Sequence, residues 1–221
     1  MKNVLVVAPH PDDETLGCGG TLLKHSQNGD HIHLAIMTQM NKEEYGPERV
    51  EERALEIESV VRALGVKSVH QLTFTPTRLD TVPIGDIVSA LSTVVNDVKP
   101  DTVYAPYPGD VHTDHRVVFD AVVSCSKWFR YPFVRSIMIY ETISETEFGL
   151  NPDSGGFKPN VFVDIGKFLD RKIEVFNLYR SEVGAYPFPR CEKSIRALAT
   201  LRGSTAGCQA AESFMLLREI R

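Results

Sequence analysis

The chain has 221 residues and a formal net charge of −5, with 43% hydrophobic and 24% charged residues. These proportions are typical of a globular protein, and the length suits one well-packed domain better than two. A negative net charge without a run of about five like charges argues against nucleic acid and anionic membrane as partners.

The sequence predicts neither an export signal nor a disulfide framework. The apolar run from Val4 to Pro9 is too short for the core of a signal peptide, and no stretch approaches the roughly 18 apolar residues of a membrane-spanning helix. The four cysteines, at positions 18, 125, 191 and 208, lack Cys-x-x-Cys spacing and suggest reduced thiols. We therefore expect a cytoplasmic protein with a single domain over residues 1–221.

The first predicted strand, Val4 to Val7, contains only aliphatic residues, as expected of a strand buried on both faces. It leads into Ala8-Pro-His-Pro-Asp-Asp-Glu14, in which one imidazole and three carboxylates lie within five positions. A helix should follow at about 16–28. A charged helix start explains one or two carboxylates, but not three beside a histidine. Because open α/β sheets bind ligands at the carboxyl ends of their strands, this turn is a candidate functional site.

Strands and helices then alternate along the chain. Apolar runs and apolar residues spaced three and four apart predict strands at 31–37, 68–74 and 102–108 and helices at 48–64 and 84–98. The loop at 75–82 lies between two of these elements, and we expect it to shape the rim of a pocket.

Arg53 falls inside the apolar stripe of the helix predicted at 48–64 instead of opposite it. One interpretation is a side chain that reaches from the edge of the stripe to water, or pairs with Glu56 three residues on. The other is a cation that enters a polar site and holds a substrate. The helical spacing alone does not decide between the two.

The strand at 102–108 is followed by Asp110-Val-His-Thr-Asp-His115, which places two imidazoles and two carboxylates within six residues. If a helix begins near His112, then His112 and His115 lie three residues apart on one face. Helix capping would account for Asp110 alone, but not for both histidines. A second candidate site therefore follows a second strand.

The last third of the chain is less regular. We expect strands at 136–142 and 160–165, helices at 166–180 and 191–202, and a candidate lid at 149–159. The final apolar run, Phe214 to Leu217, fits a helix or a strand. Strands that alternate with helices predict an α/β fold in which helices cover both faces of a mostly parallel sheet.

In such a sheet both polar clusters lie at the same edge, where His10, Asp13 and His115 would supply two nitrogens and one oxygen. Three protein ligands with an open fourth position form the arrangement of a catalytic zinc ion, which lowers the pKa of bound water to about 7. Ferrous iron accepts the same ligands. The two clusters together therefore predict a metal centre.

Three neighbouring residues complete a hydrolytic site. Asp12, beside Asp13, is placed to act as the base. His112, one helical turn before His115, would donate to developing negative charge as an imidazolium, and Asp114 would orient one of the histidines. The residues therefore predict metal-assisted hydrolysis.

The same residues resemble a known family. Ala8-Pro-His-Pro-Asp-Asp-Glu14 with Leu16-Gly-Cys-Gly-Gly20 resembles the opening signature of the LmbE-like, or PIG-L, N-acetylglucosaminyl deacetylases. The second metal motif of that family is similar to His112-Thr-Asp-His115. Weaker similarity extends to the helix with Arg53 and to the tail, Leu201-Arg-Gly203 with Ala211-Glu-Ser-Phe214. The resemblance therefore spans nearly the whole chain.

The resemblance implies a Rossmann-like three-layer sandwich and zinc-dependent removal of an acetyl group from an N-acetylated amino sugar. It places the metal on His10, Asp13 and His115, the base on Asp12, the oxyanion contact on His112 and substrate binding on Arg53. It also implies a homo-oligomer, either a trimer or a hexamer. Thr113 replaces the usual proline of the second motif, and Asp110 stands where some members have a catalytic tyrosine, so no tyrosine acid is expected.

Three alternatives remain open. The same site would suit an amide hydrolase that acts on a non-sugar substrate. His10, Asp12 and His115 also match the triad of non-haem iron oxygenases, although that chemistry favours an all-β scaffold. The glycines that begin the first helix resemble an incomplete dinucleotide fingerprint, but a nucleotide-binding module would leave His112 and His115 without a role.

Overall fold

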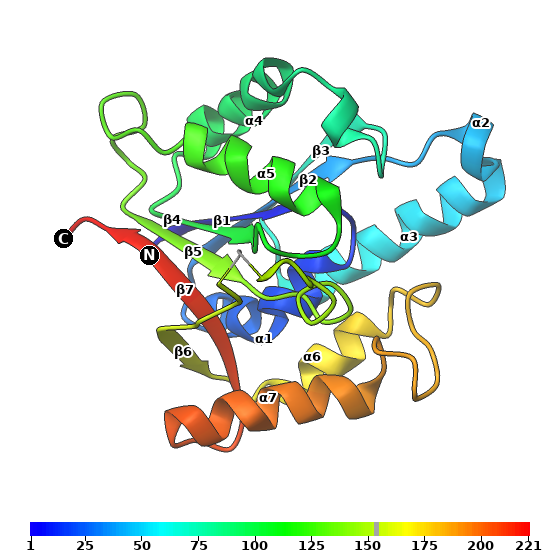
Figure 1. Ribbon diagram of the computed structural model, residues 1–221, viewed down its shortest axis with the longest axis vertical. Helices are drawn as coiled ribbons and strands as arrows, with labels where there is room; N and C mark the ends of the chain where they lie inside the picture. The colour runs from blue at the N-terminus through cyan, green and yellow to red at the C-terminus, as the bar shows by residue number, and fades with distance from the viewer. Residues whose placement is uncertain (153–154) are drawn as a thin grey trace.

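The computed structural model describes residues 1–152 and 155–221, and a single seven-stranded sheet forms its centre (Figure 1). The strand order is β3-β2-β1-β4-β5-β7-β6. The strands are β1 Asn3–Ala8, β2 His31–Thr38, β3 Ser68–Phe74, β4 Thr102–Pro106, β5 Ser136–Tyr140, β6 Val161–Asp164 and β7 Ala211–Glu219. β1 to β5 run parallel, whereas β7 runs antiparallel to its neighbours β5 and β6. The prediction of a mostly parallel sheet is confirmed.

Helices cover both faces of the sheet. They are α1 Asp13–Gln27, the short α2 Lys42–Tyr45, α3 Pro47–Leu64, α4 Ile84–Val98, α5 Thr113–Ser124, α6 Leu169–Phe176 and α7 Glu192–Ala206, with one 3-10 turn, η1 Leu79–Thr81. α4 and α5 lie on one face, and α1, α3, α6 and α7 lie on the other (Figure 1). The predicted three-layer α/β fold is confirmed. Within 1–152 and 155–221, no helix is both long and apolar enough to cross a membrane.

The central strand β1 divides its side chains between two cores. Val4 and Val6 pack into the core beneath α1 and α3, whereas Leu5 and Val7 pack into the core beneath α4 and α5. Because successive side chains of a strand point to opposite faces, a strand covered on both sides has no position for a polar residue. The polar residues of this segment therefore lie beyond the end of the strand.

Two glycines bring α1 close to its neighbours. A Cβ atom on Gly17 would overlap the ring of Tyr140, and one on Gly20 would lie 2.8 Å from Cγ2 of Ile165. The Tyr140 hydroxyl in turn donates a hydrogen bond of 2.9 Å to the carbonyl oxygen of Val7 in β1. These two positions therefore accept no larger side chain without a shift of the helix.

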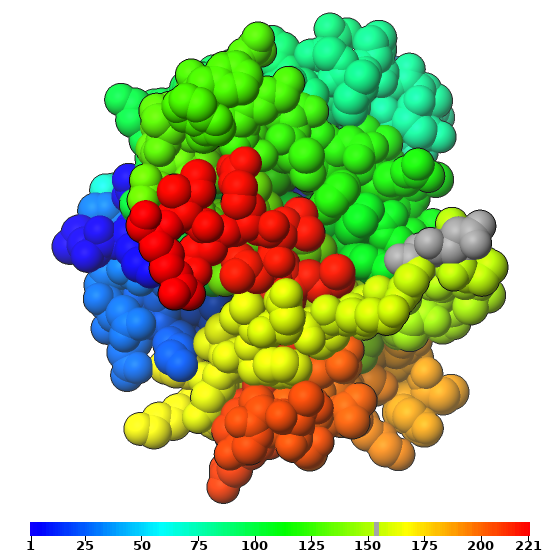
Figure 2. All heavy atoms as spheres, turned by 60° about the vertical axis from the view of Figure 1, so that its left-hand side comes forward, coloured from blue at the N-terminus to red at the C-terminus, as the bar shows by residue number. Residues whose placement is uncertain are grey.

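The last strand anchors α1 from the other side. The N–H groups of Gly20 and Thr21 donate to the carboxylate of Glu212 in β7 at 2.8 and 2.7 Å. Lys172 of α6 forms a buried ion pair of 2.7 Å with Glu212 and also donates to the carbonyl oxygen of Leu16. Figure 2 shows the red C-terminal segment, which includes the end of β7, between green and yellow segments of the chain, and in the sheet β7 lies between β5 and β6. The C-terminal strand therefore fixes the first half of α1.

Helix α6 ends earlier than the predicted residue 180. The N–H groups of Leu178 and Tyr179 bond three residues back along the chain, which tightens the last turn and ends the helix. Tyr179 is buried, and its hydroxyl donates 2.9 Å to the carboxylate of Glu14. The chain that follows, 177–191, therefore leaves the helix and turns towards the first polar cluster.

The other differences are small. α7 continues to Ala206 instead of ending at 202, and the undecided run Phe214 to Leu217 belongs to β7. The loop predicted at 75–82 contains η1. The candidate lid at 149–159 includes residues 153–154, which lie outside the described residues.

Candidate metal centre

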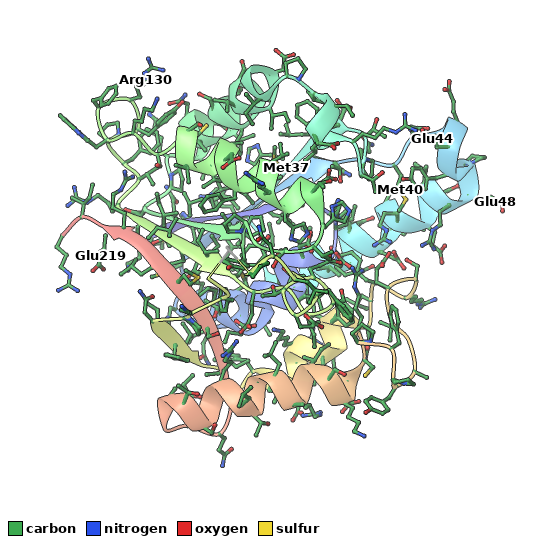
Figure 3. All side chains as sticks on the ribbon, viewed as in Figure 1. Met37, Met40, Glu44, Glu48, Arg130 and Glu219 are labelled. Atoms are coloured by element: carbon green, nitrogen blue, oxygen red, sulfur yellow. The ribbon has the colours of Figure 1, made fainter. Side chains whose placement is uncertain are left out.

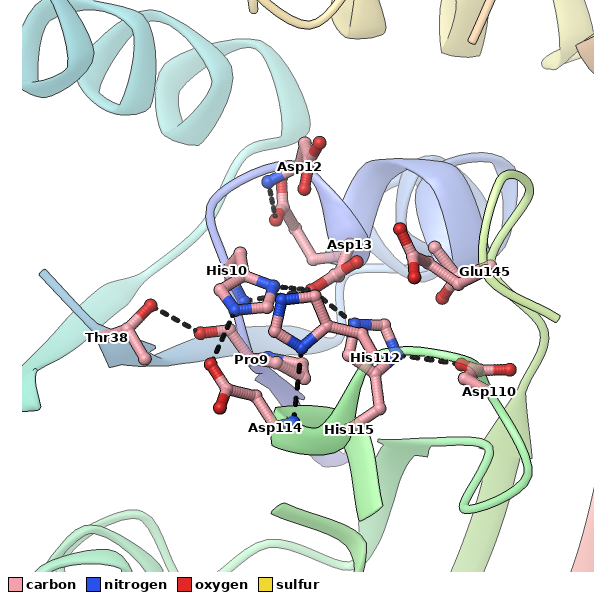
Figure 4. Close-up of polar contacts among 12 residues, drawn as sticks. Pro9, His10, Asp12, Asp13, Thr38, Asp110, His112, Asp114, His115 and Glu145 are labelled. Carbon is pink, nitrogen blue, oxygen red and sulfur yellow. Dashed lines mark hydrogen bonds and ion pairs between the residues drawn. The ribbon is translucent and has the colours of Figure 1, made fainter. Parts of the chain in front are cut away.

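The two predicted polar clusters meet at the carboxyl ends of the neighbouring strands β1 and β4 (Figure 4). His10 follows β1, Asp13 begins α1, and His115 lies in the first turn of α5. Nδ1 of His10 and Nε2 of His115 each lie 3.4 Å from Oδ2 of Asp13. The structure therefore brings together the three side chains that we expected to bind a metal. Among the described residues, Asp13 and not Asp12 forms this group, in contrast to the oxygenase alternative.

Each histidine of the cluster is held by a second carboxylate. Nδ1 of His115 lies 2.7 Å from Asp110, and Nε2 of His10 lies 2.9 Å from Asp114. With a cation bound, the nitrogen bonded to the carboxylate would keep its proton, and the other nitrogen of each ring would present its lone pair to the cation. Nε2 of His115 is buried and has no hydrogen-bond partner within the described part of the chain. This donor set fits a bound cation, because a cation would satisfy both lone pairs and the carboxylate.

The charges of the metal-free cluster favour protonated histidines. Burial lowers the pKa of His10, but hydrogen bonds to Asp114 and Asp13 outweigh burial and raise it to about 9. Burial likewise opposes charge on His115, but Asp13 and Asp110 raise its pKa to about 10. Asp13 is buried as well, yet the two imidazoliums hold its pKa below the ordinary value. A cation therefore enters this site by displacing protons.

Asp12 lies beside the cluster in a strained backbone conformation. Its φ is 131°, a region that costs a residue with a side chain about 1 to 3 kcal/mol. Its N–H donates 3.1 Å to Glu14, and its Oδ2 accepts a hydrogen bond of 2.7 Å from Nη1 of Arg190. Burial and the neighbouring Asp13 raise the pKa of Asp12 well above its ordinary value. The backbone N–H and the carboxylate of the predicted base are therefore each held by another residue.

His112 caps the N-terminus of α5 with its side chain. Nδ1 accepts a hydrogen bond of 3.1 Å from the N–H of Asp114, so the ring proton resides on Nε2. Burial and the nearby charge of His10 lower the pKa of His112 to about 4. The structure therefore favours a neutral ring that donates through Nε2–H over the imidazolium expected from the sequence.

Asp114 connects the cluster to the loop at 75–82. Its Oδ2 binds Nε2 of His10 and also accepts a hydrogen bond of 2.8 Å from the N–H of Thr77, while Oδ1 accepts from Leu79 at 3.1 Å. Thr77 has a φ of 65°. Asp114 therefore bonds both to His10 and to the backbone of the pocket rim, and its role in orienting the histidine stays a prediction.

Arg53 lies in the wall of the cavity, and its guanidinium contacts other residues of the protein. It donates to the carbonyl oxygen of Pro11 at 3.2 Å, to the hydroxyl of Ser181 at 3.0 Å and to the carboxylate of Glu182. Its Nε lies 3.4 Å from Glu56, the pairing that the sequence offered as one interpretation. Its role in substrate binding stays a prediction.

A cavity of about 210 Å³ opens beside the cluster. His10, Asp12, His112 and Arg190 are among the residues that line it. One candidate ligand, the predicted base and a neutral N–H donor therefore border one space that admits a small molecule.

The family model for PIG-L, described as GlcNAc-PI de-N-acetylase, matches residues 5–126. The chain belongs to this family. The match contains all seven residues predicted for the site, and the predicted recognition is confirmed.

Named relatives agree with membership in the PIG-L family. Diacetylchitobiose deacetylase of Thermococcus kodakarensis is 30% identical over 96% of this chain and 82% of its own length. Probable N-acetyl-alpha-D-glucosaminyl L-malate deacetylase 2 of Bacillus cereus is 26% identical over 83% and 85% of the two chains. The crystal structure of N,N'-diacetylchitobiose deacetylase from Pyrococcus horikoshii superposes with a TM-score of 0.79, at 25% identity, over 98% of this chain and 84% of that chain.

In this PIG-L member, sequence reasoning missed the residues that hold the site in place. Arg190 donates to Asp12, to Glu182 at 2.8 Å, to Glu145 at 3.1 Å and, through Nε, to Ser144 at 2.7 Å. Arg190 itself belongs to no motif, and neither do its partners other than Asp12, so no sequence signal pointed to Arg190.

The other missed residue is Asp110, which we considered only as a helix cap. It is buried against His115, and its second oxygen accepts a hydrogen bond of 2.6 Å from Thr146. Its place between a buried strand and two histidines was the available signal, because metal-ligating histidines commonly donate to a carboxylate.

Proposed function

We propose that this protein is a metal-dependent hydrolase that removes the acetyl group from an N-acetylated amino sugar, and that one domain over residues 1–221 carries the activity. The observation that carries this proposal is the convergence of His10, Asp13 and His115, with each imidazole held by a further carboxylate. The names of the two curated relatives specify diacetylchitobiose and N-acetyl-alpha-D-glucosaminyl L-malate, which supports the substrate class.

Zinc is the metal that we propose, and ferrous iron is the alternative. The donor set supports both, because two imidazole nitrogens and one carboxylate oxygen suit either ion. His10 and His115 would contribute Nδ1 and Nε2, and Asp13 a carboxylate oxygen. When bound, such an ion acts as a Lewis acid towards the amide carbonyl and lowers the pKa of water in the site.

Asp12 and His112 would supply the proton chemistry. Arg190 engages Oδ2 of Asp12, which leaves Oδ1 to accept a proton from the attacking water. The same carboxyl group then returns a proton to the amine nitrogen as the C–N bond breaks, so acetate and a free amine leave the site. Nε2–H of His112 donates to the carbonyl oxygen while negative charge develops on it.

Asp114 acts through His10 and not on the substrate. Its carboxylate holds Nε2 of His10 and the backbone of the loop at 75–82, so it sets the direction of the Nδ1 lone pair. We also keep two expectations from the sequence. The scattered cysteines predict a cytoplasmic protein. The family resemblance implies a homo-oligomer, a trimer or a hexamer, whose size light scattering of the purified protein would measure.

The test measures acetate release from a panel of N-acetylglucosamine derivatives by the zinc-loaded protein and by Asp12→Asn. We expect the wild type to release acetate, and the variant to keep its metal while turnover falls about 10²- to 10⁴-fold. Stoichiometric metal without acetate release would contradict the substrate class or the reaction. A protein that binds neither zinc nor iron would contradict the whole site.

A further inference from the structure

Helix α3 carries an apolar stripe that is longer than the core it covers. Ile57, Val60 and Leu64, in its C-terminal half, are buried in the core between the helix and the sheet. Val50 and Ala54 continue the same stripe towards the N-terminus, but Val50 is only half-buried and Ala54 is exposed. Neither of them belongs to a core cluster of the described residues.

The continuation of the stripe faces the cavity of the candidate metal centre. Val50, Ala54 and Ile57 line this cavity, together with Met40 from the segment after β2. Figure 3 shows Met40 between the end of β2 and α3, whereas Glu48 lies at the outer end of that helix. One cavity of about 210 Å³ is therefore lined both by His10 of the candidate metal cluster and by these apolar side chains.

The charged side chains near these apolar residues are bonded to other residues of the protein. Arg53 lies within the stripe, but it is 5% exposed and its guanidinium bonds to Pro11, Ser181 and Glu182. Gln39 and Gln71 add uncharged amides to the lining of the cavity. Its other charged lining residues are Asp12, Glu182 and Arg190, and Arg190 bonds to both carboxylates. A purely polar sugar would leave most of this apolar surface in contact with water.

We propose that the wall formed by Met40, Val50, Ala54 and Ile57 is a subsite for an alkyl or aryl group attached to the amino sugar. The inference rests on the proposed deacetylase function and names the substrate class more narrowly, as an amphiphilic N-acylated amino sugar. Burial of apolar surface is favourable by about 25 cal/mol per Å², so such a group gains affinity that a free sugar does not.

The apolar group has two possible points of attachment, and two substrate series distinguish them. The first series varies the aglycone from methyl to octyl on N-acetylglucosamine. The second keeps a methyl aglycone and lengthens the N-acyl chain from acetyl to hexanoyl. In one of the two series we expect kcat/KM to rise about two- to fourfold with each added methylene over the first few, because each CH₂ group leaves water for the wall.

Two neighbouring positions of α3 provide a matched pair of variants. Ala54→Glu places a charge on the wall, and we expect it to flatten the rising series. Leu55→Glu places the same charge on the same helix, at a residue that is 59% exposed and does not line the cavity. We expect the series to keep its slope in Leu55→Glu. Equal slopes in the two variants would contradict the assignment of the wall.

Binding provides a readout that does not depend on turnover. Isothermal titration of the zinc-loaded protein with alkyl glucosaminides, below their micelle concentrations, should show affinity that rises with chain length and is lost in Ala54→Glu. Flat kinetic and binding series in a protein that releases acetate would overturn the subsite and leave the proposed function standing. Chain-length-dependent binding without any acetate release would support the subsite and contradict the deacetylase.

Discussion

The segment up to the end of α5 and the segment after β5 border the same cavity in different ways. The first supplies the candidate metal ligands and the predicted base from two short motifs, each at the end of a buried strand. The second supplies contacts that hold those groups, through Glu145, Tyr179, Glu182, Arg190 and Glu212. The candidate ligands and the predicted base thus come from short stretches of the sequence, whereas their orientation depends on residues far away in the sequence.

The largest effect we expect concerns the charge of the ligand cluster. At pH 7 the raised pKa values, about 9 for His10 and about 10 for His115, keep both rings protonated in the metal-free protein. Zinc must displace both protons, so its apparent affinity should fall by up to about 100-fold for each unit that pH drops below 9. Calorimetry in buffers of different ionisation enthalpy counts the released protons. Release of none would show that the rings are already neutral.

The support within the first segment should affect metal binding directly. Asp110→Asn removes the charge that holds the Nδ1–H of His115, and we expect zinc affinity to fall about 10- to 100-fold. Asp120→Asn, at an exposed position of α5, the helix that contains His115, is the matched control. Competition with a chelator measures both affinities. If the Asp110→Asn variant bound zinc as tightly as the control, Asp110 would not contribute to metal binding.

The support from the second segment should affect turnover and leave the metal in place. Arg190→Met removes the charged donor to Asp12, and we expect kcat for acetate release to fall at least about tenfold. Zinc content and affinity should remain those of the wild type. Arg196→Met, on the exposed side of α7, is the control. Loss of zinc from Arg190→Met would contradict the proposal that the second segment supports turnover without supporting metal binding.

The ligand positions are predictable from the sequence because a buried strand leaves no place for polar residues before its end. The aliphatic run from Val4 to Val7 therefore locates His10 and Asp13 at the carboxyl edge of the sheet. The same reasoning places His112 and His115 after β4. Each of these predictions needs only one strand and the turn that follows it, which are local in the chain.

The contacts that support the candidate ligands could not be predicted from the sequence, because they join residues that only the fold brings together. Arg190 lies 178 residues from Asp12 and stands in an irregular loop, where neither periodicity nor a motif indicates a partner. The run Phe214 to Leu217 is apolar throughout, so this part of β7 lacks the polar alternation that distinguishes a strand from a helix. Arg53 is an intermediate case. Its helical spacing offered the pairing with Glu56, which the structure contains, but it did not indicate the loop with Ser181 and Glu182 to which Arg53 also bonds.

The anchoring of α1 by Glu212 also bears on the order in which the protein is made. A ribosome releases His10, Asp13 and His115 well before it releases the last strand. Until β7 pairs with β5, the N–H groups of Gly20 and Thr21 lack their carboxylate partner, and Lys172 lacks its counter-charge. The growing chain therefore contains its candidate ligands before Glu212 can anchor α1, and synthesis of β7 supplies this anchor for the helix that begins at Asp13.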